Sequence, residues 1–282
     1  MTTQRIGIIG AGTMGSGIAQ AFAANGFTVI LQDISEAAVQ KGVATISGSL
    51  DRLIKKGALT DQAKAATLGL IRTTTQVADL AEADLVIEAA TENEAIKIKI
   101  LQAAEAVLKP QAIIATNTSS LSITKLAAAT QRPEQFVGMH FFNPVPMMAL
   151  VEIIRGLQTS DNTVAVVTQL AQALGKTPIG VKNSAGFVVN RILCPMINEA
   201  IFVFSEGLAS AAEIDEGMKL GCNHPIGPLA LADLIGLDVL LAVMEVLYQA
   251  FEDPKYRAAP LLKEMVHAGY LGRKTKRGFY TY

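Results

Sequence analysis

Short runs of apolar residues alternate with longer segments of helical periodicity over the first two thirds of the chain. Each run has the length and aliphatic content of a buried strand, and polar or glycine-containing stretches separate the runs. Strands are predicted over Arg5–Ile9, Thr28–Gln32, Asp84–Glu88, Ile113–Thr116, Phe136–His140, Val151–Ile154 and Thr177–Val181. Helices are predicted between them over Thr13–Asn25, Ala37–Lys56, Asn93–Leu108 and Asn162–Leu174. This alternation predicts the α/β class, with a doubly wound, mostly parallel sheet that helices cover on both faces.

The pattern changes near Asn183, after which we expect no further strand. A long helix is predicted over Gly186–Ser205, and the segment Ser210–Glu213 has a capping-box pattern that starts another helix. Pro228 suits the first position of a strongly helical segment. The sequence therefore predicts an α/β domain followed by an all-helical C-terminal domain. The predicted domains are residues 1–183 and residues 184–282.

Composition and charge narrow the function. Charged residues make up 17% of the chain, against about 25% in average soluble proteins, so the apolar surplus must be buried, and a subunit interface is a natural place. The net charge of −1 argues against a nucleic-acid partner and against an anionic membrane. The two cysteines, Cys194 and Cys222, are too few for a disulfide framework, and reduced thiols favour a cytoplasmic protein.

Two apolar stretches, Phe187–Phe204 and Leu229–Phe251, are about long enough to cross a bilayer. The first contains Arg191 and Glu199, and the second contains acidic residues such as Asp233. Such charges are costly within a membrane, so both stretches are predicted to be buried helices of a soluble protein. The amino-terminal apolar run is short and broken by a glycine, so no signal peptide is expected.

A glycine-rich turn follows the first predicted strand and opens the first predicted helix. We expect its residues to contact a nucleotide cofactor: Gly10, Gly12, Thr13, Met14 and Gly15. Gly10 permits a tight turn, Gly12 lets a pyrophosphate approach the backbone, and Gly15 lets the helix pack closely on the strand. Free amides at the helix start then bind the phosphates. This context predicts a Rossmann-type dinucleotide-binding domain.

Asp33 ends the second predicted strand and completes the dinucleotide-binding fingerprint. A carboxylate at this place accepts hydrogen bonds from the ribose hydroxyls of NAD and repels the 2′-phosphate of NADP. The next residues, 34–36, include no arginine that could accommodate that phosphate, so NAD is the predicted cofactor. Two alternatives stay open: a glycine turn in a protein that binds no nucleotide, and FAD, although no second flavin-binding segment is evident.

His140 is one of three histidines and ends a predicted strand, while Glu152 lies inside a later one. A buried carboxylate needs a partner, and a histidine–carboxylate pair is a common general base near neutral pH. With NAD bound, we expect His140 to take the proton of a substrate hydroxyl. Glu152 would fix the histidine tautomer and stabilise the imidazolium. The alternative is a structural histidine bonded to backbone carbonyls, with Glu152 facing solvent.

Two further polar segments are candidates for the site. The segment Thr116–Ser120 follows a predicted strand, and loops at the carboxyl ends of parallel strands are where open α/β sheets bind ligands. The alternative for this segment is an N-cap cluster for a helix that starts near Ser122. Asn190 lies in the apolar start of the long helix, where a buried amide needs partners. It could meet a substrate between the domains or bond to a neighbouring loop.

The order of these motifs closely resembles that of the short-form bacterial L-3-hydroxyacyl-CoA dehydrogenases. The matching segments are the glycine turn with Asp33, then Asn117–Ser120, Gly138–Pro144, Glu152 and Gly186–Arg191. The resemblance runs from the first strand to the C-terminal Gly278–Tyr280. It implies reversible NAD-linked oxidation of (S)-3-hydroxybutyryl-CoA to acetoacetyl-CoA by a homodimer that associates through the helical domain. No metal site is predicted.

The resemblance also implies roles for single residues. It makes His140 the general acid/base with Glu152 as its partner, and it gives Ser119 and Asn190 the positioning of the reacting group. Positions that contact the cofactor or lie near it are Glu92, Lys97, Asn117, Ser119, Asn143 and Lys274. Positions near the CoA moiety are Ser49 and Lys56.

Three of these expectations concern basic residues and have simpler alternatives. Arg52 lies beside Lys56 on one basic helix face, which suits the phosphates of CoA and adds Arg52 to the predicted substrate contacts, although such faces are usually only solvated. Lys97 can point into the cofactor cleft or share a solvated face with Lys99. Lys274 belongs to a basic tail that could simply be solubilising charge.

Competing functions follow from the same residues. A dehydrogenase of similar architecture could act on a hydroxy acid without CoA, such as a sugar acid. A structural or regulatory protein could keep the NAD fold without turnover, but the intact pair of His140 and Glu152 argues against it. An NAD-sensing DNA-binding protein lacks support because the chain has no basic surface joined to a helix-turn-helix pattern. Acyl-chain length is left open, since one methylene changes binding by only about 1–3 kcal/mol.

Overall fold

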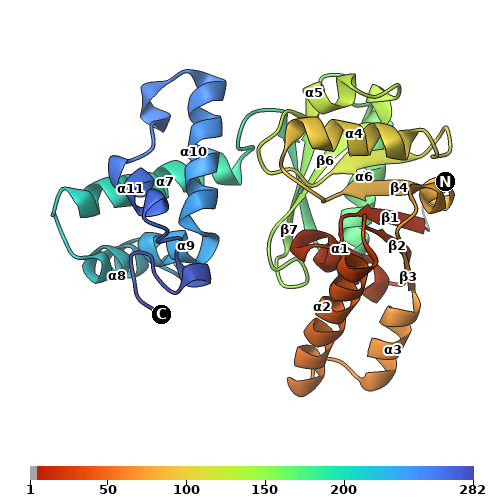
Figure 1. Ribbon diagram of the computed structural model, residues 1–282, viewed down its shortest axis with the longest axis horizontal. Coiled ribbons are helices and arrows are strands. Elements are labelled where there is room, and N and C mark those ends of the chain that lie inside the picture. Colours follow the sequence, from red (N-terminus) through yellow and green to blue (C-terminus); the bar gives the residue numbers. More distant parts are fainter. Residues whose placement is uncertain (1–4) are drawn as a thin grey trace. The chain divides into compact units, whose positions relative to one another are not determined.

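The computed structural model describes residues 5–282. The chain divides into two compact units, the first ending at Asn183 and the second spanning Ser184–Tyr282 (Figure 1). The division falls where the alternation of strands and helices stops in the sequence.

An eight-stranded sheet forms the centre of the first unit, in the order β3-β2-β1-β4-β5-β6-β7-β8. Every neighbouring pair is parallel except β6 and β7, which confirms the predicted doubly wound, mostly parallel sheet. The strands are β1 (Arg5–Ile9), β2 (Thr28–Gln32), β3 (Ile71–Thr74), β4 (Leu85–Glu88), β5 (Ile113–Thr116), β6 (Phe136–Phe141), β7 (Leu150–Arg155) and β8 (Thr177–Lys182).

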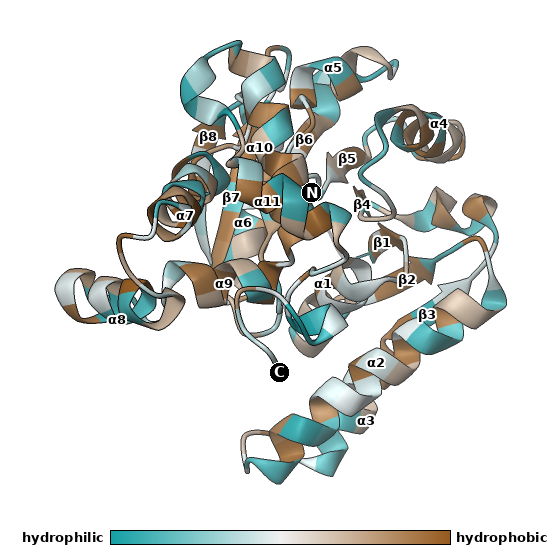
Figure 2. Cartoon of the chain, turned by 60° about the vertical axis from the view of Figure 1, so that its left-hand side comes forward, coloured by the Kyte–Doolittle hydropathy of each residue, from teal (hydrophilic) through white to brown (hydrophobic). Residues whose placement is uncertain are grey.

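Helices fill the connections, and side-chain oxygens satisfy the free amides at several of their starts. The helices of this unit are α1 (Thr13–Ala24), α2 (Glu36–Lys55), α3 (Asp61–Gly69), α4 (Glu94–Glu105), α5 (Ile123–Ala128) and α6 (Asp161–Ala173), with short 3₁₀ turns at Val77–Glu82 and Pro133–Gln135. Ser35, Thr60, Asn93, Ser122 and Ser160 each accept a hydrogen bond from the third residue after them. Hydrophobic and hydrophilic residues both occur along α2 (Figure 2), which has only four buried positions.

Two elements of this unit, β3 and α3, were not predicted, and α5 was expected only as the alternative for the segment Thr116–Ser120. The strand β3 is four residues long, lies at the sheet edge beside β2 and buries none of its residues fully. The helix α3 buries only Thr67. Both lack the apolar periodicity on which the prediction depended.

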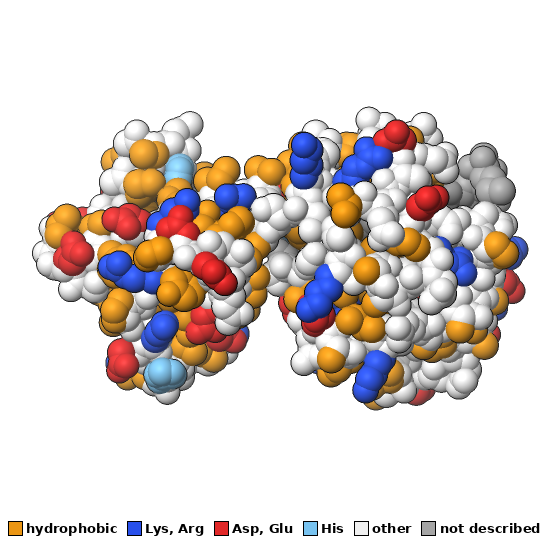
Figure 3. Space-filling model, turned by 90° about the horizontal axis from the view of Figure 1, so that it is seen from above, with side chains coloured by type: hydrophobic (Ala, Val, Ile, Leu, Met, Phe, Trp, Pro, Cys, Tyr) orange, Lys and Arg blue, Asp and Glu red, His pale blue; other side chains and the backbone are white. Residues whose placement is uncertain are grey.

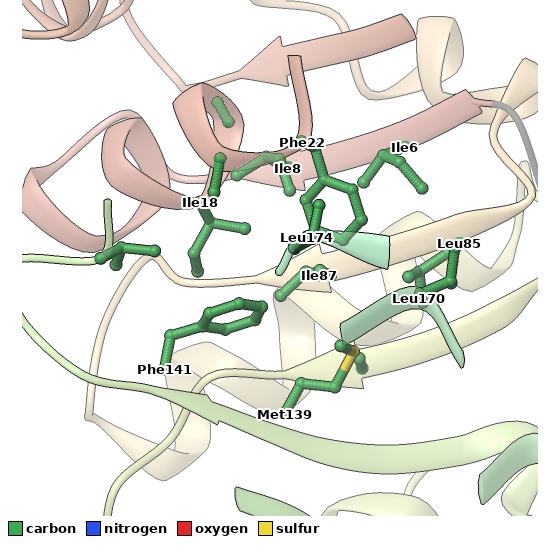
Figure 4. Close-up of a cluster of buried hydrophobic side chains, with 14 of the residues drawn as sticks. Ile6, Ile8, Ile18, Phe22, Leu85, Ile87, Met139, Phe141, Leu170 and Leu174 are labelled. Carbon is green, nitrogen blue, oxygen red and sulfur yellow. The ribbon is translucent and has the colours of Figure 1, made fainter. Parts of the chain in front are cut away.

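The main core lies between one face of the sheet and two helices. Ile18 and Phe22 of α1, together with Leu170 of α6, meet side chains of β1, β4 and β6 (Figure 4). The labelled side chains from those strands are Ile6, Ile8, Leu85, Ile87, Met139 and Phe141. Because side chains alternate along a strand, burying Met139 and Phe141 here directs His140 to the opposite face of the sheet.

The second unit is built of helices, as predicted. They are α7 (Val189–Ser205), α8 (Ala211–Cys222), α9 (Pro228–Ile235), α10 (Leu237–Phe251) and α11 (Pro260–His267), with 3₁₀ turns at Pro254–Tyr256 and Arg273–Thr275. The first helix starts three residues later than expected because Phe187 has a left-handed φ of 48°. The helical segment after Pro228 is two helices, since Gly236 at φ 101° breaks it.

Two buried aspartates hold the C-terminal segment of the second unit. Asp233 accepts hydrogen bonds from the amides of Phe279 and Tyr280, at 2.9 and 3.0 Å. Asp215 accepts from the Tyr280 hydroxyl at 2.7 Å and from the amide of Leu229 at the start of α9. The last residues are thereby fixed to the helices. None of the helices described for residues 5–282 is both long and apolar enough to cross a membrane.

Candidate active site

The glycine turn joins β1 to α1 at the carboxyl edge of the sheet. Gly10 has a φ of 97°, and its amide donates to the carbonyl of Gln32 at 2.8 Å. A Cβ on Gly15 would lie 1.7 Å from the Gly10 carbonyl oxygen, so only glycine fits there. A Cβ on Gly12 would meet no atom within 4 Å, so the backbone there faces open space. The start of α1, with exposed Thr13 and half-buried Met14, is thus accessible to a pyrophosphate.

Asp33 follows β2 directly and also holds the glycine turn. Its Oδ2 accepts a hydrogen bond from the amide of Ala11 at 2.7 Å, and its Oδ1 accepts from the amide of Ile34 at 2.7 Å. A carboxylate has about four acceptor sites, so two backbone bonds leave capacity for ribose hydroxyls. The residues of the turn and Asp33 therefore fit the predicted dinucleotide.

His140 and Glu152 are direct neighbours across two strands. The antiparallel register of β6 and β7 pairs them, so their separation of 12 residues along the chain becomes a contact. His140 Nδ1 lies 2.7 Å from Glu152 Oε2, with side-chain exposures of 7% and 0%. The Phe142 ring lies 4.4 Å from the imidazole between centroids. An ionised Glu152 can only accept, so the pair places a proton on Nδ1 and makes Nε2 the acceptor nitrogen of the neutral ring.

The loop after β5 brings Ser119 to Glu92. Glu92 Oε1 accepts from the Ser119 amide at 2.8 Å and from its hydroxyl at 3.1 Å. The hydroxyl of Thr118 donates to the same oxygen at 2.7 Å. Asn117, predicted to lie near the cofactor, uses its Oδ1 to accept from the Phe141 amide at 2.9 Å. Asn117 thus ties this loop to the end of the strand that carries His140.

Lys97 does not lie on a solvated face, which was the alternative to its predicted place near the cofactor. It is buried with a side-chain exposure of 1% and forms an ion pair with the fully buried Glu88. Glu88 also accepts from the Thr116 hydroxyl at 2.8 Å and from the Ala90 amide at 2.8 Å. Lys97 Nζ lies 3.9 Å from Glu92 Oε2. Through the Thr116 hydroxyl, the pair is bonded to the strand end from which the Ser119 loop begins.

The remaining predicted residues are dispersed. Asn143 is exposed in the loop after β6. On α2 and just after it, Ser49 is half-buried, and Arg52 and Lys56 are exposed. Asn190 belongs to α7 of the second unit, where it is half-buried.

Lys274 also belongs to the second unit. It forms an ion pair with Asp238, at 2.6 Å from Oδ2. The basic tail is thereby anchored to the start of α10.

Two buried charged residues near the carboxyl edge of the sheet, Glu88 and Lys176, were not predicted as site residues. Glu88 ends a strand whose residues are all buried, and a charge at the end of such a run is the signal that could have found it. Lys176 precedes β8, and burial lowers the pKa of its ammonium group below the ordinary value. No sequence signal separates Lys176 from an exposed lysine.

Two family models together match nearly the whole chain. Residues 5–184 match the NAD-binding domain of 3-hydroxyacyl-CoA dehydrogenase, and residues 186–282 match its C-terminal domain.

Relatives that match over nearly their full length are named 3-hydroxybutyryl-CoA dehydrogenases. A probable 3-hydroxybutyryl-CoA dehydrogenase of Deinococcus radiodurans is 54% identical, over 99% of this chain and 100% of the relative. A 3-hydroxybutyryl-CoA dehydrogenase of Bradyrhizobium diazoefficiens is 52% identical, over 99% of this chain and 95% of the relative. The crystal structure of (S)-3-hydroxybutyryl-CoA dehydrogenase from Ralstonia eutropha is 66% identical, with a TM-score of 0.97, covering 100% of this chain and 99% of that chain.

Proposed function

The chain belongs to the 3-hydroxyacyl-CoA dehydrogenase family of NAD-dependent enzymes, and from that premise we propose that it interconverts (S)-3-hydroxybutyryl-CoA and acetoacetyl-CoA. The names of its full-length relatives support this substrate. The contact of 2.7 Å between His140 and Glu152, at the same sheet edge as the glycine turn, is the observation that carries the proposal.

In the oxidation direction, His140 Nε2 takes the proton of the substrate hydroxyl. Glu152 accepts the hydrogen bond of Nδ1 and stabilises the imidazolium that forms. Bound NAD would supply the acceptor for the hydride of the carbon that bears this hydroxyl. In the reverse direction, the imidazolium returns its proton to the forming alkoxide.

The chain's other predicted site residues bind the cofactor and the substrate and orient the reacting oxygen. Ser119 orients the reacting oxygen with Asn190, and Asp33 binds the ribose of the adenosine. The hydroxyl of Ser119 donates to Glu92, so its oxygen keeps lone pairs that can accept from a ligand hydroxyl. Arg52 and Lys56 are exposed and positive, which suits the phosphates of CoA.

The substrate proposal is tested by comparing acetoacetyl-CoA with free acetoacetate as oxidants of NADH. We expect a kcat/KM at least about 100-fold higher for the thioester, equivalent to about 2.7 kcal/mol of transition-state binding. Equal values would assign the enzyme to hydroxy acids without CoA. Bound NADH with no turnover of either compound would make it a protein that keeps the NAD fold for another purpose.

We also propose that the protein is a homodimer that associates through its second unit. Large apolar side chains are exposed there, among them Ile192 at 67% and Leu220 at 77%. In Figure 3, hydrophobic side chains lie among charged ones over this unit. Equilibrium sedimentation of the full chain should give twice the monomer mass, and Ile192→Glu should lower it. A monomeric wild type would refute this assignment.

A further inference from the structure

Lys176, between α6 and β8, is a buried ammonium group for which the proposed chemistry has no use. Its Nζ donates to the backbone carbonyls of Val145 and Met148, both at 2.7 Å. Within residues 5–282, no carboxylate forms an ion pair with it, and burial is the cause of its lowered pKa. Burying a charge without a counter-charge destabilises a protein. The contact therefore needs a reason other than stability.

The strand register places Lys176 beside the active site. Strand β7 runs antiparallel to β6, and Leu150 at its start pairs with Thr177 at the start of β8. The residue before β8 consequently lies at the carboxyl end of β6. The loop that Lys176 contacts, residues 142–149, connects the strand of His140 to the strand of Glu152 and contains Asn143.

This loop has few other attachments. Most of its residues are exposed, and Val145 is the one that is buried. Val145 packs against α1 so closely that a Cβ on Gly17 would lie 2.9 Å from the Val145 Cβ. The Ala149 carbonyl accepts from the Thr177 amide at 2.8 Å. The loop is thus held between the helix that begins at the glycine turn and the ammonium of Lys176.

We propose that Lys176 is a positioning residue for hydride transfer, which fixes the loop 142–149, and with it Asn143, against the dinucleotide-binding helix. This inference rests on the proposed function. Two carbonyls that converge on one ammonium define the loop's path more tightly than exposed backbone would. The charge strengthens both hydrogen bonds, because charge-assisted bonds are about twice as strong as neutral ones.

The test compares Lys176→Met with the wild type in the full-length enzyme. The substitution keeps the aliphatic stem and removes the donors. We expect kcat to fall about 10- to 100-fold, the effect of a small misplacement, with KM for acetoacetyl-CoA changed less than about threefold. The kinetic isotope effect with NADH deuterated at the transferred position should rise, because hydride transfer becomes slower. Lys41→Met, on the exposed side of α2, is the matched control and should match the wild type in both measurements.

A merely structural Lys176 would lower the melting temperature and leave the kcat and isotope effect of the folded enzyme unchanged, and that result overturns the proposal. If Lys176→Met does not fold, Lys176→Arg decides. Arginine keeps the donors but carries them further from the backbone, so a lower kcat at the wild-type melting temperature supports positioning. Wild-type turnover of that variant overturns it.

Chemical rescue adds an independent readout. Propylammonium chloride should restore turnover to Lys176→Ala, whereas tetramethylammonium, which has no N–H donor, should not. Equal responses to the two salts would contradict the proposed contact. Failure of the proposed function is distinguishable, since the wild type itself would then not oxidise NADH with acetoacetyl-CoA.

Discussion

Two buried acid–base pairs lie at the same edge of the sheet, Glu152 with His140 and Glu88 with Lys97. Both carboxylates are fully buried, and their partners are almost as deep. The two bases differ in chemistry, because a lysine ammonium can only donate hydrogen bonds whereas a neutral imidazole has one donor and one acceptor nitrogen. His140 is also the more accessible base, at 7% against 1% for Lys97. Both pairs are buried, so burial does not distinguish them. We expect the chemistry of the base to decide which pair exchanges protons with a substrate.

Replacing His140 should have the largest effect on turnover. His140→Ala removes the proton acceptor and should lower kcat by about 100- to 10,000-fold. Its affinity for NADH should stay within about threefold of the wild type, because the dinucleotide contacts come from other residues. Stopped-flow absorbance and NADH fluorescence measure the two quantities. A decrease in kcat of less than tenfold would show that His140 does not transfer the proton. The pair of His140 and Glu152 would then be structural, like that of Lys97 and Glu88.

Substitutions in the Glu88–Lys97 pair should change the free energy of unfolding. Lys97→Met leaves a buried carboxylate without its counter-charge, and about 3–5 kcal/mol of unfolding free energy should be lost. Glu88→Gln/Lys97→Met removes both charges and should recover most of that loss. Lys99→Met, exposed on the same helix, is the control and should be neutral. Urea unfolding measures all three, and a double variant no more stable than Lys97→Met would show that this pair is not a charge-compensating one.

Asp33 differs from Glu152 and Glu88 because it accepts hydrogen bonds from backbone amides rather than from a basic side chain. Asp33→Ala should weaken NAD binding about 10- to 100-fold, the contribution of a charge-assisted hydrogen bond. NADP, which the carboxylate repels, should lose less affinity. Isothermal titration with both cofactors tests this. An unchanged ratio of the two affinities would contradict the ribose contact.

Cys194 is a buried thiol whose pKa is changed by burial. Among the predicted changes, its effect on the free energy of unfolding should be the smallest. Burial raises the pKa of the Cys194 thiol from 9.0 to about 12. The folded state therefore keeps a proton that the unfolded state loses, so stability is full below pH 9 and falls as pH rises toward 12. The expected slope is at most about 1.4 kcal/mol per pH unit.

Cys194→Ala should flatten this alkaline decline when both proteins are unfolded in urea between pH 8.5 and 10.5. Parallel curves would mean that other groups cause it. Cys222, which is exposed, serves as a control, since Cys222→Ala should leave the decline unchanged.

Much of the site was predictable because it depends on strand ends. Asp33 and His140 each end an apolar run, and parallel strands bring such ends to one edge. The contact of His140 with Glu152 was only permitted by the sequence, since a register fixes it. The burial of Lys97 was not predictable, because Lys97 and Lys99 lie in one polar helical pattern and only packing separates them. The break at Gly236 was hidden for a similar reason, since the segment is apolar on both sides of it.

The bond from the Ala11 amide to Asp33 has a consequence for redesign of cofactor preference. The carboxylate that would discriminate against NADP is also an anchor of the turn that would receive the phosphates. A variant made to accept NADP by deleting this acid would therefore loosen its own phosphate site. Successful conversion must supply a neutral acceptor for the Ala11 amide, such as the side-chain carbonyl oxygen that Asp33→Asn introduces, before a cation is introduced nearby.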